Sequence, residues 1–463
     1  MKHVHLIGIG GTGLSAIARV LLERGYAVSG SDRVASPLFL AITAAGARTF
    51  LGHAAEHIAG ADIVIQSSAI PDDNPEVIAA KDQGIPVLKR SEFLEELTQG
   101  KDTLAVAGSH GKTTTTAMLV WILEQLGVDP SFIVGSVVNQ LGCNARSGAG
   151  PYFAIEADEY DNMFLGLSPK IAVVTNIEHD HPDCFPTKEI YREAFKKFVE
   201  LVRPDGCALL CRDDPGAKSL AEALSGTSIQ LITYGVSQGS DYRAVIINLE
   251  RGSPRFNLLY RQDENKIINL GEITLSLAGR HNVLNATAAL AVIHQLDLSV
   301  DAAIDAIAGF SGTERRFQIL GVENEITIID DYGHHPTEIE ATLEAARTAY
   351  PDQKIWAVWQ PHTYSRTQTL EKAFIQALTL ADRVVVLKIY AAREKDPGYS
   401  AKTIADSLPE GKAFYMDNFN EAGQFLSGEL SAGDVAIFFS AGDATEVSHA
   451  VLDSLEQQKL RNG

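Results

Sequence analysis

Apolar residues recur along the chain in short β-type runs that alternate with longer helical patterns. The run 103–106 reads as a buried strand, which stops at Gly108 before a helical pattern over 113–126. Strand, loop and helix follow one another in the same way at the N-terminus and again after residue 313. Such alternation predicts parallel sheets covered by helices, and the expected fold class is α/β.

The N-terminal pattern is strand, glycine turn, helix and second strand. Its turn has the form G-x-G-x-x-G, with Asp32 about 20 residues further on. A diphosphate can approach the backbone of such a loop and Asp32 can bond a ribose hydroxyl, so a UDP-sugar fits as well as NAD. A glycine turn without a ligand is the alternative. The candidate loop residues are Gly8, Gly10, Gly11, Thr12 and Gly13.

Two serines follow the next strand of this region. The strand 62–66 runs into Ser67 and Ser68 before a turn at Pro71. Their hydroxyls therefore lie at the carboxyl end of a strand, where open α/β sheets bind ligands. Capping or turn bonding by the two serines is the other interpretation.

A second glycine loop, G-S-H-G-K-T, separates the strand 103–106 from the helix after it. Backbone N–H groups of such a loop and the positive end of the helix face an anion, Lys112 can reach outer phosphates, and Thr113 can offer a hydroxyl to Mg²⁺. Val106 stands where the usual P-loop has a further glycine. The loop predicts binding of a nucleoside triphosphate. The alternative is a glycine turn with a solvated lysine. The candidate residues are Gly108, Ser109, His110, Gly111, Lys112, Thr113 and Thr114.

Carboxylates crowd the end of the next apolar strand, 153–155. They are Glu156, Asp158, Glu159 and Asp161. Because four carboxylates in six residues repel one another, a divalent cation nearby is a reason for the cluster, and a solvated loop is the alternative.

The following strand also ends in metal-type ligands, Asn176 to His181. Two-metal clamps that neutralise a transferring phosphate use such groups, so Thr113, Glu156 and His181 are expected to converge on Mg²⁺. His179 and His181 could instead bind zinc, but two histidines alone do not complete a tetrahedral site.

The next part of the chain, residues 207–275, reads as a β-rich segment to which the sequence assigns no function. Asn282 and Asn285 share one face of a helix, where they can hold an adenine or ribose edge or act as caps. The last eight residues, 456–463, read as a frayed end.

The C-terminal third repeats the strand and helix alternation. The strand 325–329 leads to Asp331 and His335, and Pro336 is suited to begin the next helix. Further on, Arg366 can grip a carboxylate with two parallel hydrogen bonds.

Composition limits the partners. Lys and Arg number 39 against 59 Asp and Glu, and the formal charge of -20 argues against nucleic-acid and anionic-membrane partners. Four cysteines without a C-x-x-C pair favour a reducing compartment. With neither a signal-peptide pattern nor a run of membrane-spanning length, a cytoplasmic protein without membrane insertion is expected. A length of 463 residues suggests about three domains.

Eight motifs occur in an order that resembles the Mur ligase family over nearly the whole chain. They are GIGGTG, GSHGKTTT, EADEYD, TNIEHDH, HNVLNA, RRF, DDYGHHPTE and QPHTYSRT. The resemblance implies three domains: a Rossmann-like UDP-sugar domain (1–98), a central P-loop ATPase-like α/β domain with an extra β segment (99–312), and a C-terminal Rossmann-like domain that closes on the nucleotide and carries the amino acid (313–463). It implies an enzyme that uses ATP and Mg²⁺ to join L-alanine to UDP-N-acetylmuramate in peptidoglycan precursor synthesis. A monomer or homodimer is expected.

The resemblance also implies residue roles. The implied catalytic residues are Lys112, His181, Arg316 and His335. Thr113, Glu156 and His181 would bind Mg²⁺; Asn282 and Asn285 would lie beside adenine; Asp331 would bind the ribose and Arg316 the γ-phosphate; His335 and Arg366 would position the amino acid. The loop from Gly8 to Gly13, with Asp32, Ser67 and Ser68, would hold the UDP-sugar.

Two positions depart from the commonest pattern. Thr363 stands where many members that add L-alanine have arginine, and Tyr160 stands where many have serine. The form with tyrosine also occurs in members that add the tripeptide L-Ala-γ-D-Glu-meso-diaminopimelate to the same sugar. The rival hypotheses are therefore that recycling ligase, an NAD-dependent oxidoreductase, and a nucleotide-binding regulator without catalysis.

Overall fold

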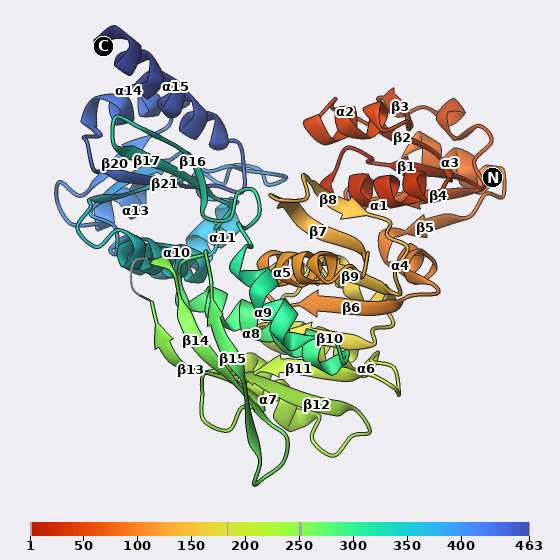
Figure 1. The fold of residues 1–463 in the computed structure, drawn as a ribbon. Helices are drawn as coiled ribbons and strands as arrows, with labels where there is room; N and C mark the ends of the chain where they lie inside the picture. The colour runs from red at the N-terminus through yellow and green to blue at the C-terminus, as the bar shows by residue number, and fades with distance from the viewer. Residues whose placement is uncertain (1, 183, 250–251, 463) are drawn as a thin grey trace. The chain divides into compact units, whose positions relative to one another are not determined.

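The computed structural model describes residues 2–182, 184–249 and 252–462 of the chain (Figure 1). Contacts between Cα atoms divide it into two compact units. The first comprises Met1–Val245, Asn257–Ile273 and Leu284–Ala308. The second comprises Ile246–Phe256, Thr274–Val283 and Gly309–Gly463.

A five-stranded parallel sheet forms the N-terminal part of the first unit. Its strands are β1 (His3–Ile7), β2 (Ala27–Asp32), β3 (Arg48–Leu51), β4 (Ile63–Gln66) and β5 (Val87–Lys89), in the order β3-β2-β1-β4-β5. Its helices are α1 (Thr12–Glu23), α2 (Pro37–Ala44), η1 (Ala55–Ile58), α3 (Pro75–Asp82) and α4 (Arg90–Thr98). The strand order reverses at β1, so a crevice for a ligand is expected beyond the carboxyl end of β1.

The second sheet has ten strands in the order β15-β14-β13-β12-β11-β10-β6-β9-β7-β8. The first five along the chain are β6 (Asp102–Ala107), β7 (Ser131–Val138), β8 (Cys143–Arg146), β9 (Tyr152–Glu156) and β10 (Ile171–Val174). The others are β11 (Cys207–Cys211), β12 (Gln230–Gly235), β13 (Tyr242–Asn248), β14 (Arg255–Arg261) and β15 (Ile267–Thr274). β6 pairs in parallel with β9 and β10, so the carboxyl ends of these three strands meet at one edge.

Helices pack on this sheet and on one another. They are α5 (Lys112–Gln125), η2 (Tyr160–Gly166), α6 (Lys188–Glu200), α7 (Pro215–Ala223), α8 (Arg280–Gln295) and α9 (Val300–Ala308). The helices α5 and α9 lie side by side (Figure 1), and Trp121 Nε1 on α5 donates to the Ala306 carbonyl on α9 at 2.8 Å. Most of α5 is buried, which fixes the position of its first turn.

The third sheet, in the second unit, has the strand order β16-β17-β21-β18-β19-β20. Its strands are β16 (Gln318–Glu323), β17 (Ile326–Asp331), β18 (Ile355–Trp359), β19 (Arg383–Leu387), β20 (Ala413–Met416) and β21 (Val435–Phe439). Its helices are α10 (Pro336–Ala349), α11 (Tyr364–Thr369), α12 (Glu371–Leu378), α13 (Lys402–Ser407), α14 (Phe419–Glu429) and α15 (Thr445–Asn462). The strands pair in parallel except β16, which is antiparallel to β17, and buried apolar side chains cover both faces of the sheet, as packing between helix layers requires.

The structure confirms the α/β fold class and corrects two local expectations. The C-terminal residues expected to fray belong to α15 as far as Asn462. The β-rich segment 207–275 also contains the helix α7, whose first turn is capped by Asp214 Oδ1 accepting from Ala217 N at 2.6 Å. Across the described residues, none of the helices combines the length and apolar character needed to span a bilayer.

Candidate functional site

The central glycine loop lies between β6 and α5. Gly108 has φ +143° and Gly111 has φ +80°, both in the region that side chains other than glycine rarely adopt. A Cβ atom at Gly108 would also clash with the hydroxyl of Thr175 at the end of β10. The loop can therefore turn this tightly only with glycine at these two positions.

Asn176 fixes the middle of the loop. Its backbone carbonyl accepts from Ser109 N at 3.1 Å, and its side-chain oxygen accepts from His110 N at 2.8 Å. Its amide group donates to the His110 carbonyl at 3.0 Å. Two loop N–H groups are used in this way, and the N–H groups in the first turn of α5, from Lys112 to Thr114, are donors suited to an anion.

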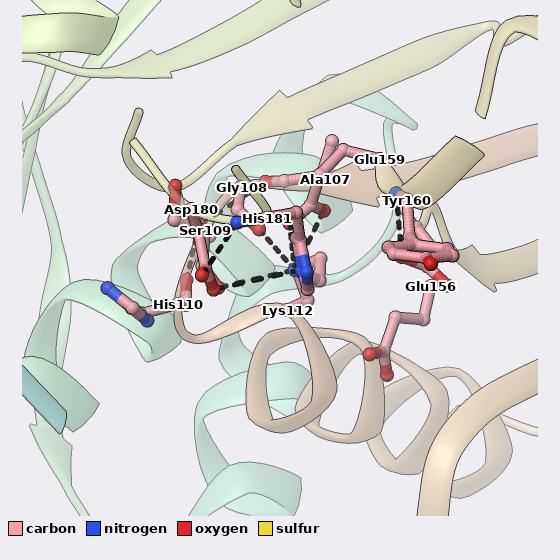
Figure 2. Close-up of polar contacts among 12 residues, drawn as sticks. Ala107, Gly108, Ser109, His110, Lys112, Glu156, Glu159, Tyr160, Asp180 and His181 are labelled. Atoms are coloured by element: carbon pink, nitrogen blue, oxygen red, sulfur yellow. Dashed lines mark hydrogen bonds and ion pairs between the residues drawn. The ribbon is translucent and has the colours of Figure 1, made fainter. Parts of the chain in front are cut away.

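The Lys112 ammonium lies at the centre of the polar contacts in Figure 2. It donates to the Gly108 carbonyl at 2.5 Å and forms an ion pair with Glu159 at 2.9 Å. Burial alone would lower the pKa of Lys112, but the carboxylates of Glu159 and its acidic neighbours outweigh it and raise that pKa. The lysine side chain, 12% exposed, therefore stays charged.

Thr113 and Glu156 form the oxygen pair predicted as metal ligands. Thr113 Oγ1 donates to Glu156 Oε1 at 3.1 Å, and Glu156 Oε2 accepts from Gly135 N at 2.6 Å. Two neighbouring corners of a Mg²⁺ octahedron with bonds of 2.0–2.1 Å lie about 2.9 Å apart. The donor pair thus has the chemistry and the spacing that this ion requires.

His181 lies beside the same carboxylates. Its Nε2 atom is 3.7 Å from Glu159 Oε1 and 3.7 Å from Asp180 Oδ2. Its ring meets Tyr160 edge to face, with centroids 5.2 Å apart (Figure 2). His179 has a different environment, because its Nε2 lies 2.7 Å from the Phe185 carbonyl. The two histidines therefore do not converge on one zinc ion.

His110 and Ser109 both contact Glu178, in the segment after β10. His110 Nε2 lies 3.1 Å from Glu178 Oε2, and its ring points away from Lys112 in Figure 2. The Ser109 hydroxyl donates to the Glu178 carbonyl at 2.7 Å and lies 2.9 Å from the Tyr191 hydroxyl. These two side chains anchor the loop to the segment after β10.

The N-terminal glycine loop connects β1 with α1. Gly8 has φ +92°, and Gly11, just before α1, donates its N–H to the Gly8 carbonyl at 3.1 Å. Asp32 at the end of β2 accepts from Gly10 N at 2.9 Å. The predicted ribose-binding carboxylate thus lies against the loop itself, while Thr12, the first residue of α1, is exposed.

Arg90 approaches this loop from the start of α4. A Cβ atom at Gly13 would fall on its guanidinium group, so a larger residue there would displace the end of the Arg90 side chain. The same guanidinium forms an ion pair with Asp158 at 3.0 Å. Arg90 therefore links the N-terminal loop to the acidic segment after β9, which the sequence patterns did not reveal.

Ser67 and Ser68 follow β4, next to the N-terminal loop. Ser67 N donates to the Ile7 carbonyl at 3.1 Å and its hydroxyl accepts from Ala69 N at 3.3 Å. This is the turn bonding that the sequence left as an alternative. Ser68 is exposed.

A buried carboxylate, Glu76, lies behind the end of β2. Burial alone would raise its pKa, but interactions with His5, Ser31 and His57 outweigh burial and lower that pKa to about 2. The Ser31 hydroxyl donates to it at 2.6 Å and His57 Nδ1 lies 2.7 Å away. The cluster holds the residue before Asp32 in place.

In the second unit, Arg316 and Asp331 lie at the carboxyl end of β17. Arg316 donates to Glu338 at 3.3 Å, and its guanidinium lies over the Tyr332 ring at 5.1 Å. Asp331 accepts from Phe317 N at 2.8 Å and from Gly333 N at 2.7 Å. Burial raises the pKa of Asp331 to about 6, and Arg316 opposes that rise.

His335 and Arg366 occupy the same edge of the third sheet. His335 is the residue before α10, and its Nδ1 accepts from Thr337 N at 3.4 Å. Arg366, on α11, has Nη1 3.2 Å from His362 Nδ1. Thr363 before α11 has φ +65° and ψ 146°, a strained conformation for a β-branched residue.

Asn282 and Asn285 are both buried on α8. Asn282 donates to the Ala278 carbonyl at 2.7 Å, whereas Asn285 accepts from the Thr115 hydroxyl on α5 at 3.1 Å. Asn285 therefore ties α8 to the helix that carries the phosphate loop.

Of the predicted ligands, the structure brings Lys112, Thr113, Glu156 and His181 around one strand edge. The prediction did not select Glu159, Asn176, Tyr191 or Arg90. A signal was present for Glu159, which belongs to the acidic cluster, and for Asn176, which begins the set of ligand-type residues after the next strand.

Three family models match consecutive parts of the chain. A "Mur ligase family, catalytic domain" model matches residues 3–102, a "Mur ligase middle domain" model residues 106–293, and a "Mur ligase, glutamate ligase domain" model residues 315–442. Together they span most of the sequence.

Curated relatives match over the full length. A UDP-N-acetylmuramate–L-alanine ligase from a Geobacter species is 41% identical over 463 residues, covering 99% of each chain. The ligase of the same name from Carboxydothermus hydrogenoformans is 42% identical, covering 98% of this chain and 96% of the relative.

Solved structures are similar as well. UDP-N-acetylmuramate-alanine ligase MurC from Thermotoga maritima matches with a TM-score of 0.83 and 28% identity, covering 99% of this chain and 100% of the other. A murein peptide ligase from Psychrobacter arcticus matches with a TM-score of 0.72 and 25% identity, covering 98% and 99%.

Proposed function

Since the chain belongs to the Mur ligase family, we propose that it joins L-alanine to the lactyl carboxylate of UDP-N-acetylmuramate at the expense of ATP. The reaction is a step of peptidoglycan precursor synthesis. Identity of 41% to the Geobacter ligase over the whole length supports this substrate pair. A UDP-sugar and ATP are metabolites of the cytoplasm, and we place the enzyme there.

The observation that carries the proposal is the cationic loop beside the carboxylates of the strand β9. Lys112 and the first N–H groups of α5 face the space where a triphosphate would lie, and Thr113 with Glu156 forms an oxygen pair next to it. This arrangement serves phosphoryl transfer. An NAD-dependent oxidoreductase does not require this combination of a lysine loop and an oxygen pair.

Mg²⁺ is the ion that the oxygen pair fits. Thr113 and Glu156 would hold one ion, and the His181 imidazole, 3.7 Å from the Glu159 carboxylate, would contribute to a second. Bound Mg²⁺ would offset negative charge on the β- and γ-phosphates. Thr113 and Glu156 offer oxygen atoms, the ligand type that this hard cation prefers.

In the first chemical step, the lactyl carboxylate oxygen attacks the γ-phosphorus and the bond to ADP breaks. Charge on the transferring group is spread over its outer oxygens, and the Lys112 ammonium offsets it. We assign the same task to the Arg316 guanidinium. The backbone N–H groups at the start of α5 hold the remaining phosphates in line.

In the second step, the amine of L-alanine attacks the acyl phosphate carbon and inorganic phosphate leaves. We propose that His335 and Arg366 position the amino acid. Arg366 has a planar guanidinium that can bind the α-carboxylate with two hydrogen bonds. We also propose that Asn282 and Asn285 lie beside the adenine and that Asp331 binds the ribose.

The N-terminal loop is proposed to hold the UDP diphosphate. Gly8, Gly10 and Gly11 let a diphosphate approach the backbone, and the start of α1 supplies N–H donors. Arg90, which packs on Gly13, adds a cation on this side. Ser67, Ser68 and Asp32 line the end of the same sheet. Whether the chain is a monomer or a homodimer stays a prediction.

The proposal is tested by phosphate release from ATP, Mg²⁺ and UDP-N-acetylmuramate. We expect release only after an amino acid is added, with L-alanine giving a higher kcat/KM than glycine or L-serine. Mass spectrometry should show UDP-N-acetylmuramoyl-L-alanine. Phosphate release that does not depend on any amino acid or peptide would contradict the proposal.

The tripeptide ligase is the second candidate, favoured by Tyr160 and by the similarity to the Psychrobacter structure. In the same assay it would turn over L-Ala-γ-D-Glu-meso-diaminopimelate in preference to free L-alanine. A higher kcat/KM for the tripeptide would therefore replace the first proposal with this one.

A further inference from the structure

Glu159 is a buried carboxylate directly over the phosphate loop. It immediately precedes η2, and 1% of its side chain is exposed. A carboxylate buried to this degree is expected only where cationic or hydrogen-bonding groups compensate for lost water. Its contacts therefore indicate what it does.

The first contact is with Lys112. The ammonium uses its donors on the Gly108 carbonyl at 2.5 Å, on the Ser109 carbonyl at 3.3 Å, and on Glu159, with distances of 2.9 and 3.1 Å to the two carboxylate oxygens. An ammonium has three donors. A phosphate can engage this lysine fully only by replacing one of these acceptors.

The other contacts are with the residues on either side of the loop. The Tyr191 hydroxyl donates to Glu159 Oε1 at 3.2 Å and lies 2.9 Å from the Ser109 hydroxyl. His181 Nε2 lies 3.7 Å from the same Oε1. The carboxylate can therefore remain partnered after Lys112 leaves it.

We propose that Glu159 is a positioning residue that takes the place of a phosphate on Lys112 and is displaced by the outer phosphates of the nucleotide. The inference rests on the proposed function for the presence of ATP at this loop. Of the three acceptors on Lys112, the carboxylate is the one that carries charge, and an incoming phosphate repels it. It is therefore the acceptor that the nucleotide displaces, and it then stays beside Tyr191 and His181.

Because Glu159 competes with phosphate for Lys112, removing the charge of Glu159 should raise the affinity for a nucleotide. In Glu159→Gln, the amide binds Lys112 less strongly, so Mg²⁺-free ADP, measured by calorimetry in EDTA, should bind about tenfold more tightly than to the wild type. AMP lacks the outer phosphate, and its affinity should change much less. The kcat of the ligase reaction should fall, because Tyr191 and His181 lose their charged partner.

Asp158→Asn is the matched control. Asp158 lies next in the chain and pairs with Arg90 at 3.0 Å, so this variant removes one negative charge from the same segment without touching Lys112. Its ADP affinity should change less than that of Glu159→Gln. A residue that only supports the fold would lose both ADP affinity and kcat on substitution.

Unchanged or weaker ADP binding by folded Glu159→Gln would overturn the inference, as would an equal gain for AMP or for Asp158→Asn. If Glu159→Gln does not fold, Glu159→Asp replaces it, because the shorter side chain keeps the charge but withdraws from Lys112. A smaller gain in ADP affinity would then support the exchange, and no gain would overturn it. Since ADP binding is measured without UDP-sugar or amino acid, its outcome is independent of which substrates are joined.

Discussion

Replacing Lys112 by alanine lowers the kcat for amino-acid-dependent phosphate release by about a thousandfold, the order of effect of removing a donor aimed at developing charge. The ammonium is the cation held within the loop, and it is 12% exposed, so little water can replace it. The KM for ATP should rise as well, because the same ammonium contacts phosphate in the ground state. Initial rates at saturating UDP-N-acetylmuramate and L-alanine measure both constants.

Lys170→Ala is the control for this variant. Lys170 pairs with Asp102 at 2.9 Å, at the opposite end of β6 from the loop, and is 30% exposed. It should leave kcat within about twofold of the wild type, in keeping with the small effect of exposed ion pairs. A Lys112→Ala protein that folds and keeps its kcat would contradict the assignment of the loop.

Replacing Glu156 by glutamine lowers kcat by about a hundredfold or more and raises the Mg²⁺ concentration needed for half-maximal rate. With its amide oxygen toward Gly135 N and its NH2 group toward the Thr113 hydroxyl, glutamine can keep both contacts and occupy the same space, so the fold is retained while the charge on the metal side is lost. A titration of rate against Mg²⁺ at fixed ATP separates the two effects.

Asp161→Asn is the control in the same acidic segment. Asp161 is exposed and has φ +55°, a conformation that asparagine tolerates. Its Mg²⁺ dependence should equal that of the wild type. If Glu156→Gln has an unchanged Mg²⁺ requirement, the metal is held elsewhere.

The fold class and the loop were predictable because both depend on local patterns. The strand before Gly108, the tight turn at Gly108 and Gly111 and the helix after it each have their own signal in the sequence. The family resemblance was confirmed by models that match most of the chain. Parallel pairing of β6 with β9 and β10 then brings Glu156 and His181 to the loop.

The roles within the acidic segment could not be predicted in the same way. After β9 the chain leaves the strand, and Glu159 itself has helical backbone angles (φ -75°, ψ -22°), so the period of two no longer says which carboxylate faces the loop. The residue pattern therefore offers no reason to prefer Glu159 as the partner of Lys112. Tyr191 comes from α6, which lies later in the chain, and only the tertiary structure brings it to Glu159.

Helix α7 illustrates a different limit. In the segment expected to be β-rich, Asp213, Asp214 and Pro215 are residue types typical of a turn, but Asp214 caps a helix and Pro215 is its first residue. A turn and a helix N-terminus share these residue types, because both need a side-chain acceptor for free N–H groups. Only the residues after Pro215 distinguish the two structures.

The central claim is that this loop and its carboxylates activate the sugar's carboxylate by phosphorylation. The most direct measurement uses UDP-N-acetylmuramate with ¹⁸O in both lactyl carboxylate oxygens, together with ATP, Mg²⁺ and L-alanine. Attack through an acyl phosphate moves one labelled oxygen to the released phosphate and leaves the other in the amide. Phosphate carrying one ¹⁸O atom is the predicted result, and unlabelled phosphate accompanying amide formation would contradict the account.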